Sequence, residues 1–236
     1  YKNTLENHKV ELIAERTTIT GPHSVKLASG REISAKVILV ATGAWPIIPE
    51  VEGAEHGITS NEVFHLDECP GRIVIVGGGY IANEFAGIFH QFGSHVTMVN
   101  RGGTLLRGYD ETVRDRLLQI SMMKGINFRF NAKMEKIEKN GDGTLCVRFA
   151  DGDPVAADLV LFATGRRPHT EGLGLETAGV ELNEKYKDGI RTVLGIHSHG
   201  YPNLFIMGGY QATFQFNVTD VLQTQGNHIA ACIDYA

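Results

Sequence analysis

The chain has 236 residues, of which 22 are lysine or arginine and 27 are aspartate or glutamate, so its formal net charge at pH 7 is −5. This acidic balance argues against a surface built mainly to bind nucleic acid or an anionic membrane. With 42% hydrophobic and 21% charged residues, the composition excludes global disorder. The length allows one large domain or two smaller ones.

The three cysteines, Cys69, Cys146 and Cys232, lie far apart, so neither a disulfide scaffold nor a CxxC zinc site is expected. No apolar run approaches the roughly 20 residues that span a bilayer, and the start lacks the features of a signal peptide. These observations predict a soluble protein of the reducing cytoplasm, without a membrane partner. The start also lacks an initiator methionine, which predicts a fragment or an excised piece of a longer chain.

Short β-type runs dominate the first part of the chain. Residues 10–13, 17–19 and 24–27 are predicted to form a small antiparallel meander, because glycine-containing turns separate these runs. Residues 37–40 are apolar without alternation, which predicts a strand buried on both faces and ending at Ala41-Thr42-Gly43. Residues 44–70 are expected to be a connection.

From residue 72 the pattern changes to strand, turn, helix, strand. An apolar strand at 73–76 is followed by three glycines, a helix to about Gln91 and a second strand at 96–99, which predicts a βαβ unit. Within this helix, four residues at helical spacing are predicted to form the core face that packs on the sheet. They are Phe85, Ile88, Phe89 and Phe92.

A second helix is predicted from Glu111 to Lys124, with Asp110 as its N-cap, because apolar residues recur there at helical spacing. Strands are then predicted at 126–130, 145–149 and 159–162, the last ending in Ala163-Thr164-Gly165. No metal site is predicted: His197 and His199 are two residues apart but have no acidic or thiol partner close in sequence.

The run Gly77-Gly78-Gly79-Tyr80-Ile81-Ala82 fits the pattern G-x-G-x-x-[G/A] and stands directly between a buried strand and a helix. In such a motif the first glycine permits the tight turn and the next motif glycine lets the backbone approach a pyrophosphate. The free N–H groups of the helix N-terminus then face the phosphates. The context favours a dinucleotide site over a loop that merely turns.

The end of the second strand bears on which dinucleotide binds. An NAD site places an acidic residue about 20 positions after the first glycine, where it binds the ribose hydroxyls. Here that region holds Arg101 and Arg107, and the only acidic residue between Gly77 and Arg107 is Glu84 in the helix. Because guanidinium groups hold phosphate bidentately, NADP is favoured over NAD, although both arginines could simply be solvated.

The residues from Val76 to Ile88, followed by Arg101 and by Leu106-Arg107-Gly108-Tyr109-Asp110, resemble the NADPH domain of glutathione reductase, a pyridine nucleotide-disulfide oxidoreductase. The resemblance covers residues 1 to about 183. It implies an α/β fold in which a Rossmann-like NADP-binding domain, residues 44–165, is inserted between pieces of a partial FAD-binding domain, residues 1–43 and 166–236. The first piece would contain the meander and the buried strand.

The resemblance also implies roles for individual residues. Tyr80 would be a lid between the nicotinamide and the flavin, Arg101 and Arg107 would hold the 2′-phosphate, and Thr17 and Thr42 would lie beside FAD. The implied NADP contacts are Gly77, Gly78, Gly79, Tyr80, Ile81, Glu84, Arg101, Arg107 and Gly165.

The departures from the family pattern matter as much. The family's first glycine fingerprint, its redox-active CxxxxC pair and its C-terminal interface domain have no counterpart among these 236 residues. No residue is therefore assigned a thiol or acid/base role in catalysis.

After about Asn183 the likeness changes, because residues 191–210 resemble the C-terminal part of Baeyer-Villiger flavin monooxygenases. Gly208-Gly209 stands where a reductase has a Gly-Asp pair, which argues against direct FAD ligation there. The two resemblances predict a hybrid with its junction near 183–189. The monooxygenase fingerprint, Phe-x-Gly-x-x-x-His-x-x-x-Trp, is absent.

Three functions remain open. The chain could be the NADPH-binding part of a glutathione-reductase-like flavoprotein, in which NADPH reduces FAD and FAD reduces a disulfide. It could be a non-catalytic NADP-binding module, or part of an FAD- and NADPH-dependent Baeyer-Villiger-type monooxygenase. The expected cofactor is NADP, with FAD left open, and the expected partner is a complementary flavin-domain chain or a second copy.

Overall fold

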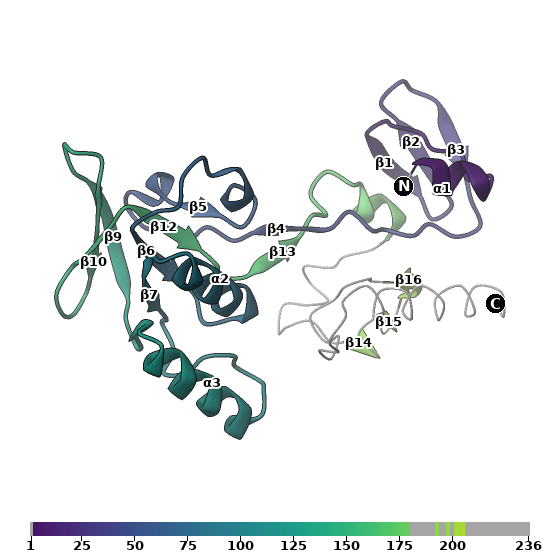
Figure 1. Ribbon diagram of the computed structural model, residues 1–236. Coiled ribbons are helices and arrows are strands. Elements are labelled where there is room, and N and C mark those ends of the chain that lie inside the picture. The colour runs from purple at the N-terminus through teal and green to yellow at the C-terminus, as the bar shows by residue number, and fades with distance from the viewer. Residues whose placement is uncertain (1, 180–191, 194–196, 199–200, 206–236) are drawn as a thin grey trace. The chain divides into compact units, whose positions relative to one another are not determined.

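The computed structural model describes residues 2–179, 192–193, 197–198 and 201–205 (Figure 1). The monooxygenase-like tail falls largely outside these residues, and Gly208-Gly209 lies entirely outside them. The chain divides into two compact units, one formed by Tyr1–Gly43 with His169–Ala236 and the other by Ala44–Pro168.

The first unit contains an antiparallel meander in which the predicted strands at 17–19 and 24–27 are confirmed and the third strand lies at 32–34, where none was predicted. Strands β1 (Thr17–Gly21), β2 (Ser24–Leu27) and β3 (Glu32–Ser34) form an antiparallel sheet in the order β1-β2-β3. The short helix α1 (Lys2–Asn7) precedes them, and the 3-10 turn η3 (Leu175–Ala178) lies against β1, where Ile19 N–H donates to the Leu173 carbonyl at 2.7 Å. A separate antiparallel sheet contains β14 (Thr192–Val193), β15 (His197–Ser198) and β16 (Tyr201–Phe205).

Two strands predicted in this unit do not form. Residues 10–13 and 37–40 carry no strand, and the side chains of Val10, Leu12 and Leu39 are 50%, 56% and 45% exposed. A strand requires a neighbour to pair its backbone N–H and C=O groups. Within the described part of the chain neither segment has one, so the apolar run at 37–40 stays outside any sheet and is not buried.

The second unit is built on a parallel sheet with the order β5-β12-β6-β7-β8. The five strands are β5 (Ile58–Thr59), β6 (Arg72–Val76), β7 (His95–Val99), β8 (Asn127–Arg129) and β12 (Leu159–Phe162). The predicted strands at 73–76, 96–99, 126–130 and 159–162 are therefore confirmed. Two short antiparallel strands, β4 (Ala44–Pro46) and β13 (Arg166–Pro168), pair where the chain enters and leaves this unit.

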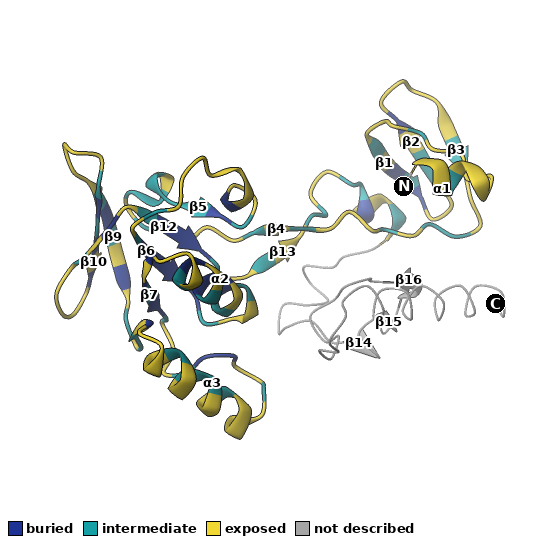
Figure 2. Cartoon of the chain, viewed as in Figure 1, coloured by how far each residue is buried: buried dark blue, intermediate teal, exposed yellow. Residues whose placement is uncertain are grey.

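Both faces of the parallel sheet are covered (Figure 2). Ile73 and Ile75 of β6 pack into a cluster with α2, whereas Val74 and Val76 pack into a second cluster with an antiparallel meander. That meander consists of β9 (Met134–Lys139), β10 (Leu145–Phe149) and β11 (Val155–Ala157). Burial on both faces explains why β6 is a continuous apolar run, and this α/β architecture is the one predicted.

Helix α2 (Tyr80–Gln91) directly follows the glycine loop and buries Ala82, Phe85, Ala86 and Phe89. The prediction that Ile88 and Phe92 belong to this core face is wrong, because their side chains are 45% and 75% exposed. The buried residues follow i, i+3, i+4, i+7 spacing from Ala82, which rotates Ile88 and Phe92 away from the sheet. Small alanines at two of the four positions let the helix lie close to the strands.

Helix α3 (Glu111–Met123) has the predicted bounds to within one residue. Its N-cap Asp110 accepts a hydrogen bond from the Val113 N–H at 3.2 Å, as a capping carboxylate does. No residue of α3 is buried. The remaining regular segments of the unit are the 3-10 turns η1 (Ala54–His56) and η2 (Val63–His65).

Candidate functional site

The glycine loop after β6 is held by the ends of two neighbouring strands. Gly77 N–H donates to the Val99 carbonyl at the end of β7 at 2.8 Å, and its φ is 137°. A Cβ atom at Gly77 would lie 2.2 Å from the Ala163 carbonyl oxygen, just after β12. The first glycine is therefore required by the fold, because both its φ and the close backbone exclude a side chain.

Gly79 differs from Gly77. It is the N-cap of α2 with an ordinary φ of −80°, and a Cβ there would meet no atom within 4 Å. Its carbonyl accepts hydrogen bonds from the Asn83 N–H at 3.1 Å and from Asn83 Nδ2 at 2.8 Å. The packing of the protein does not require a glycine here, so the open space beside the helix N-terminus is available to a ligand.

The second loop of the site runs from Arg101 to Gly108, after β7. Leu105 and Leu106 are buried and fix its second half, while Arg101 and Arg107 are exposed. Leu106 has a φ of 45°, and its N–H donates to the Gly78 carbonyl at 2.7 Å. Within the described residues neither arginine forms an ion pair. The structure thus joins the arginine-bearing loop to the glycine loop.

A concavity of about 500 Å³ lies beside the first turns of α2. Ile81 and Glu84 line it, and so does Arg166, which sequence reasoning did not select. Arg166 donates to Ser60 Oγ at 3.1 Å and to the Ala44 carbonyl at 2.5 Å, so its guanidinium is fixed. Arg166 directly follows Ala163-Thr164-Gly165, a segment that resembles the family, and this position was the signal that could have identified it.

Tyr80 is 45% exposed at the start of α2. Tyr109, directly after the arginine-bearing loop, is near it: burial raises the pKa of Tyr109, and the nearby Tyr80 and Glu84 raise it further. The Tyr109 hydroxyl is buried. Tyr80 and Glu84 of α2 are therefore close enough to affect the ionisation of Tyr109.

The two threonines expected beside FAD lie in the other unit. Thr17 donates to the Glu15 carbonyl at 3.3 Å, and Thr42 donates to the His169 carbonyl at 2.6 Å. Thr42 thus connects the two passages of the chain that make up this unit. Within Ala44–Pro168, the glycine loop contacts two other predicted segments. Gly77 lies against Ala163, in the segment that ends in Gly165, and Gly78 accepts a hydrogen bond from Leu106, the neighbour of Arg107. Thr17 and Thr42 belong to the other unit.

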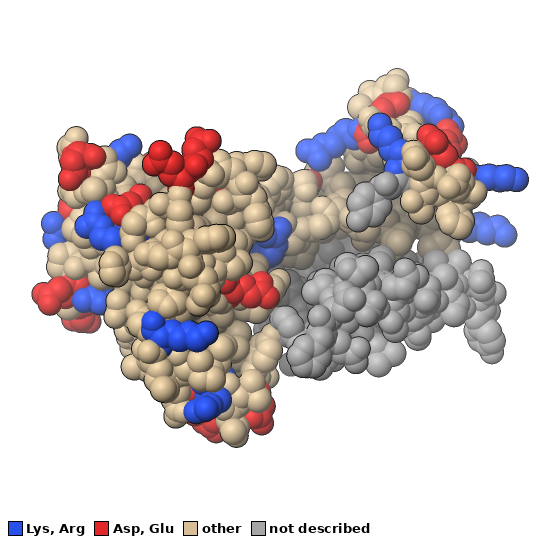
Figure 3. All heavy atoms as spheres, in the orientation of Figure 1, with Lys and Arg blue, Asp and Glu red and all other residues tan. Residues whose placement is uncertain are grey.

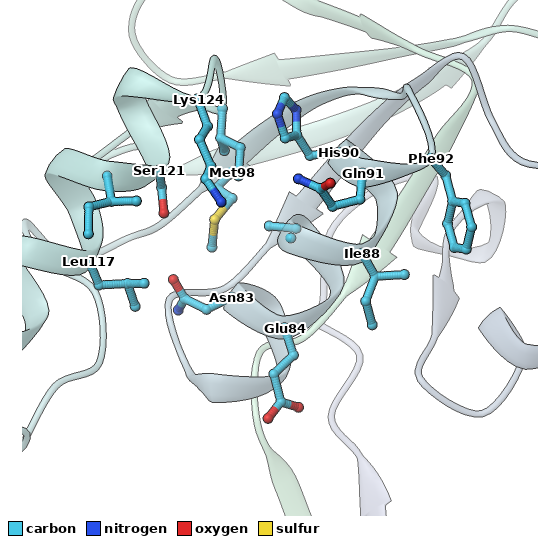
Figure 4. Close-up of a pocket in the computed structure, with 14 residues that line it drawn as sticks. Asn83, Glu84, Ile88, His90, Gln91, Phe92, Met98, Leu117, Ser121 and Lys124 are labelled. Atoms are coloured by element: carbon cyan, nitrogen blue, oxygen red, sulfur yellow. The ribbon is translucent and has the colours of Figure 1, made fainter.

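A larger groove, of about 640 Å³, lies between α2 and α3 (Figure 4). Leu117, Ser121 and Lys124 face it from the α3 side, and Asn83 and Ile88 face it from α2. Its walls are mainly apolar.

Residues 1–220 match the family model described as pyridine nucleotide-disulphide oxidoreductase. The chain belongs to this family. Members of the family use FAD together with NAD or NADP.

Among the relatives of this chain, the glutathione reductase of Burkholderia cepacia is 40% identical over 230 residues, which are 98% of this chain and 50% of the relative. That of Nostoc sp. is 38% identical over 234 residues, or 96% of this chain and 50% of the relative. The chain thus spans about half the length of these relatives. Among solved structures, the HOCl-induced flavoprotein disulfide reductase RclA from Escherichia coli matches with a TM-score of 0.78 and 28% identity, covering 96% of this chain and 52% of that one.

The chain has two free cysteines among its described residues, the exposed Cys69 and the partly buried Cys146. The described residues contain no cluster of three or more His, Cys, Asp or Glu side chains suited to a metal ion. None of the helices described is long and apolar enough to span a membrane. On the face seen in Figure 3, acidic and basic side chains are interspersed over Ala44–Pro168 and form no basic stripe of the kind that binds nucleic acid.

Proposed function

We propose that residues 44–165 are an NADPH-binding domain and that this chain is the NADPH-binding part of a glutathione-reductase-like flavoprotein. One observation carries the proposal. Gly79 stands at the N-terminus of α2, and the surrounding protein leaves room there for a side chain. A glycine that the fold does not need is explained by a ligand whose approach a side chain would block. A pyrophosphate at the N-terminal N–H groups of α2 fits that position.

In this proposal the two ends of the nucleotide have separate partners. Arg101 and Arg107, exposed and without carboxylate partners in the described part of the chain, hold the 2′-phosphate. Ile81, Glu84 and Arg166, around the 500 Å³ concavity, form the surface for the nicotinamide end. Tyr80 covers that end as a lid, and Gly165 contacts the nucleotide from the segment after β12.

When bound, FAD would supply the redox chemistry between NADPH and a disulfide; the neighbour RclA is named a flavoprotein disulfide reductase. In this chain Thr17 and Thr42 are proposed to lie beside FAD. The 166–236 segment is proposed to complete the partial FAD domain, with a complementary flavin-domain chain or a second copy as partner. The contribution of residues 44–165 is to bind and orient NADPH.

Removing both arginines tests the nucleotide assignment. Each lost charge-assisted bond is worth about 1.5–3 kcal/mol, so Arg101→Ala with Arg107→Ala should weaken NADPH at least tenfold and NADH little. Isothermal titration calorimetry measures both affinities. The control is Arg116→Ala, which removes one positive charge from an exposed position on α3 and should leave both affinities unchanged. Equal weakening of NADPH and NADH would contradict the assignment.

A second candidate function is an NADP-binding module without catalysis. The absorption spectrum of the purified chain separates the two functions. A flavin band that bleaches when NADPH is added without oxygen supports the reductase part. A colourless protein that still binds NADPH supports the module.

A further inference from the structure

Asn100 directly follows β7, at the strand end where an NAD site carries its ribose-binding carboxylate. Its backbone is fixed on both sides. Asn100 N–H donates to the Arg129 carbonyl at 2.8 Å, and its carbonyl accepts from the Ala132 N–H at 3.1 Å. The backbone of Asn100 is thus anchored to the end of β8 and to the segment that follows β8.

The Asn100 side chain closes the turn that begins the arginine-bearing loop. Its Nδ2 donates to the Thr104 carbonyl at 2.6 Å, four residues along the chain. Gly102 and Gly103, inside this turn, have no side chains that could hold it. Their other support is Asn131, whose N–H donates to the Gly102 carbonyl at a longer 3.2 Å.

The same amide packs against the glycine loop. A Cβ atom at Gly78 would lie 2.6 Å from Asn100 Nδ2 and 2.8 Å from its Cγ. Gly78 therefore lacks a side chain because the Asn100 amide occupies that space. Since the Leu106 N–H also donates to the Gly78 carbonyl, both halves of the arginine-bearing loop are fixed to the same glycine.

We propose that Asn100 is the positioning residue of the 2′-phosphate site: by closing the turn and packing on Gly78, it fixes the backbone from which Arg101 and Arg107 extend. The proposal rests on the proposed NADPH-binding function. Two exposed arginines can chelate one phosphate only if their backbone spacing is set in advance, because otherwise binding must also order the loop. Asn100 supplies that order, although it need not touch the nucleotide.

Limited trypsin digestion of the whole chain, without nucleotide, tests the ordering of the loop. Trypsin cleaves after Arg101 and Arg107, each of which is followed by glycine. In Asn100→Ala these two cleavages should accelerate about threefold or more, because the turn opens more often. Cleavage after Lys139, at the end of β9, serves as the internal standard. Unchanged rates after Arg101 and Arg107 would overturn the proposal whatever the nucleotide.

The ligand test uses adenosine 2′,5′-bisphosphate and adenosine 5′-monophosphate, which differ only in the 2′-phosphate. Asn100→Ala should weaken the bisphosphate about three- to tenfold and leave the monophosphate unchanged, as expected when one hydrogen bond that orders the site is lost. A merely structural role would weaken both ligands together and would overturn the proposal. Asn127→Ala, an exposed asparagine on β8, is the control.

Two further outcomes separate this inference from the proposed function. If the wild-type chain binds the two adenosine ligands equally, the NADP assignment fails and the inference fails with it. If the wild type prefers the bisphosphate and Asn100→Ala keeps that preference, only the inference fails. Gly78→Ala provides an independent variant: it should lower the preference in the wild type but cause no further loss in Asn100→Ala, where the obstructing amide is gone.

Discussion

The three consecutive glycines of the fingerprint have three different surroundings. Gly77 faces the backbone of Ala163, Gly78 faces the side chain of Asn100, and Gly79 faces open space. A side chain should therefore disturb folding at the first position, the arginine-bearing loop at the second and ligand binding at the third. The sequence motif alone does not distinguish these roles.

Replacing Gly79 should separate binding from folding. In Gly79→Val we expect a melting temperature only slightly below that of the wild type, because the φ of −80° suits any residue and a Cβ atom there meets no neighbour, whereas valine is a weaker N-cap than glycine. Binding of both NADPH and NADH should be lost, since the side chain blocks the pyrophosphate. Calorimetric titration and thermal unfolding measure the two effects. Gly87→Ala, also in open space, is the control, and retained binding in Gly79→Val would mean that the loop only turns the chain.

Tyr109 gives a pH-dependent prediction. Its pKa is raised above the ordinary value, first by burial and then by Tyr80 and Glu84, so the folded state keeps the proton to a higher pH than the unfolded state. Stability should therefore fall as the pH rises above about 10, where the unfolded phenol begins to ionise. Urea unfolding between about pH 9 and pH 11 should show a steeper loss in the wild type than in Tyr109→Phe. Parallel losses would contradict the prediction.

At the scale of elements, one ion pair joins two neighbouring parallel strands. Arg72 begins β6, and Asp158 directly precedes β12. The Asp158 carboxylate accepts from the Arg72 N–H at 2.7 Å and from its guanidinium at 2.5 Å, and Asp158 N–H donates to the Arg72 carbonyl at 2.9 Å. These bonds fix the register of the two strands whose far ends meet at Gly77.

Asp158→Asn should lower the free energy of unfolding by about 1 kcal/mol at neutral pH. The loss is smaller than for a buried charged hydrogen bond, because both side chains are partly exposed. The Arg72 guanidinium and N–H lower the pKa of Asp158, so its contribution is present above pH about 4 and is lost as the pH falls through the lowered value. Urea unfolding at neutral and acid pH should show a difference from the wild type only at neutral pH. A difference that persists in acid would exclude this pair as its cause.

The sequence pattern correctly predicted those helices and strands that are marked by residues within or beside them. The apolar runs of β6 and β12, the glycines before α2 and the capping Asp110 before α3 were sufficient for those elements. The prediction of a strand at 37–40 was wrong, because an apolar run alone does not show whether a neighbouring strand is present to pair with it. The sequence pattern also missed Arg166 and Asn100, whose roles depend on contacts with residues distant in sequence or in the adjoining loop.

For the whole molecule, the described core is concentrated in one unit. Within residues 2–43 and 169–179, the buried hydrophobic residues are Ile19, Leu27 and Leu175, whereas two large clusters fill Ala44–Pro168. Since local stability follows buried apolar contact, residues 2–43 should open at a lower free-energy cost than the central sheet of the second unit.

Hydrogen exchange measured by mass spectrometry should reveal this difference. Amides of β6, β7 and β12 should exchange slowest, because these strands are central in a sheet covered on both faces. Amides of β1 to β3 should exchange many times faster. Equal protection of the meander in the first unit and the central sheet would contradict the prediction.

The strand order β5-β12-β6-β7-β8 has a consequence for synthesis on the ribosome. The fingerprint loop emerges early, yet one of its walls, the Ala163 backbone beside Gly77, is translated only after α3 and the whole β9–β11 meander. At 5–20 residues per second this delay is on the order of ten seconds. During that interval the edge of β6 that later pairs with β12 is open, and an open strand edge is a site for pairing with the wrong strand.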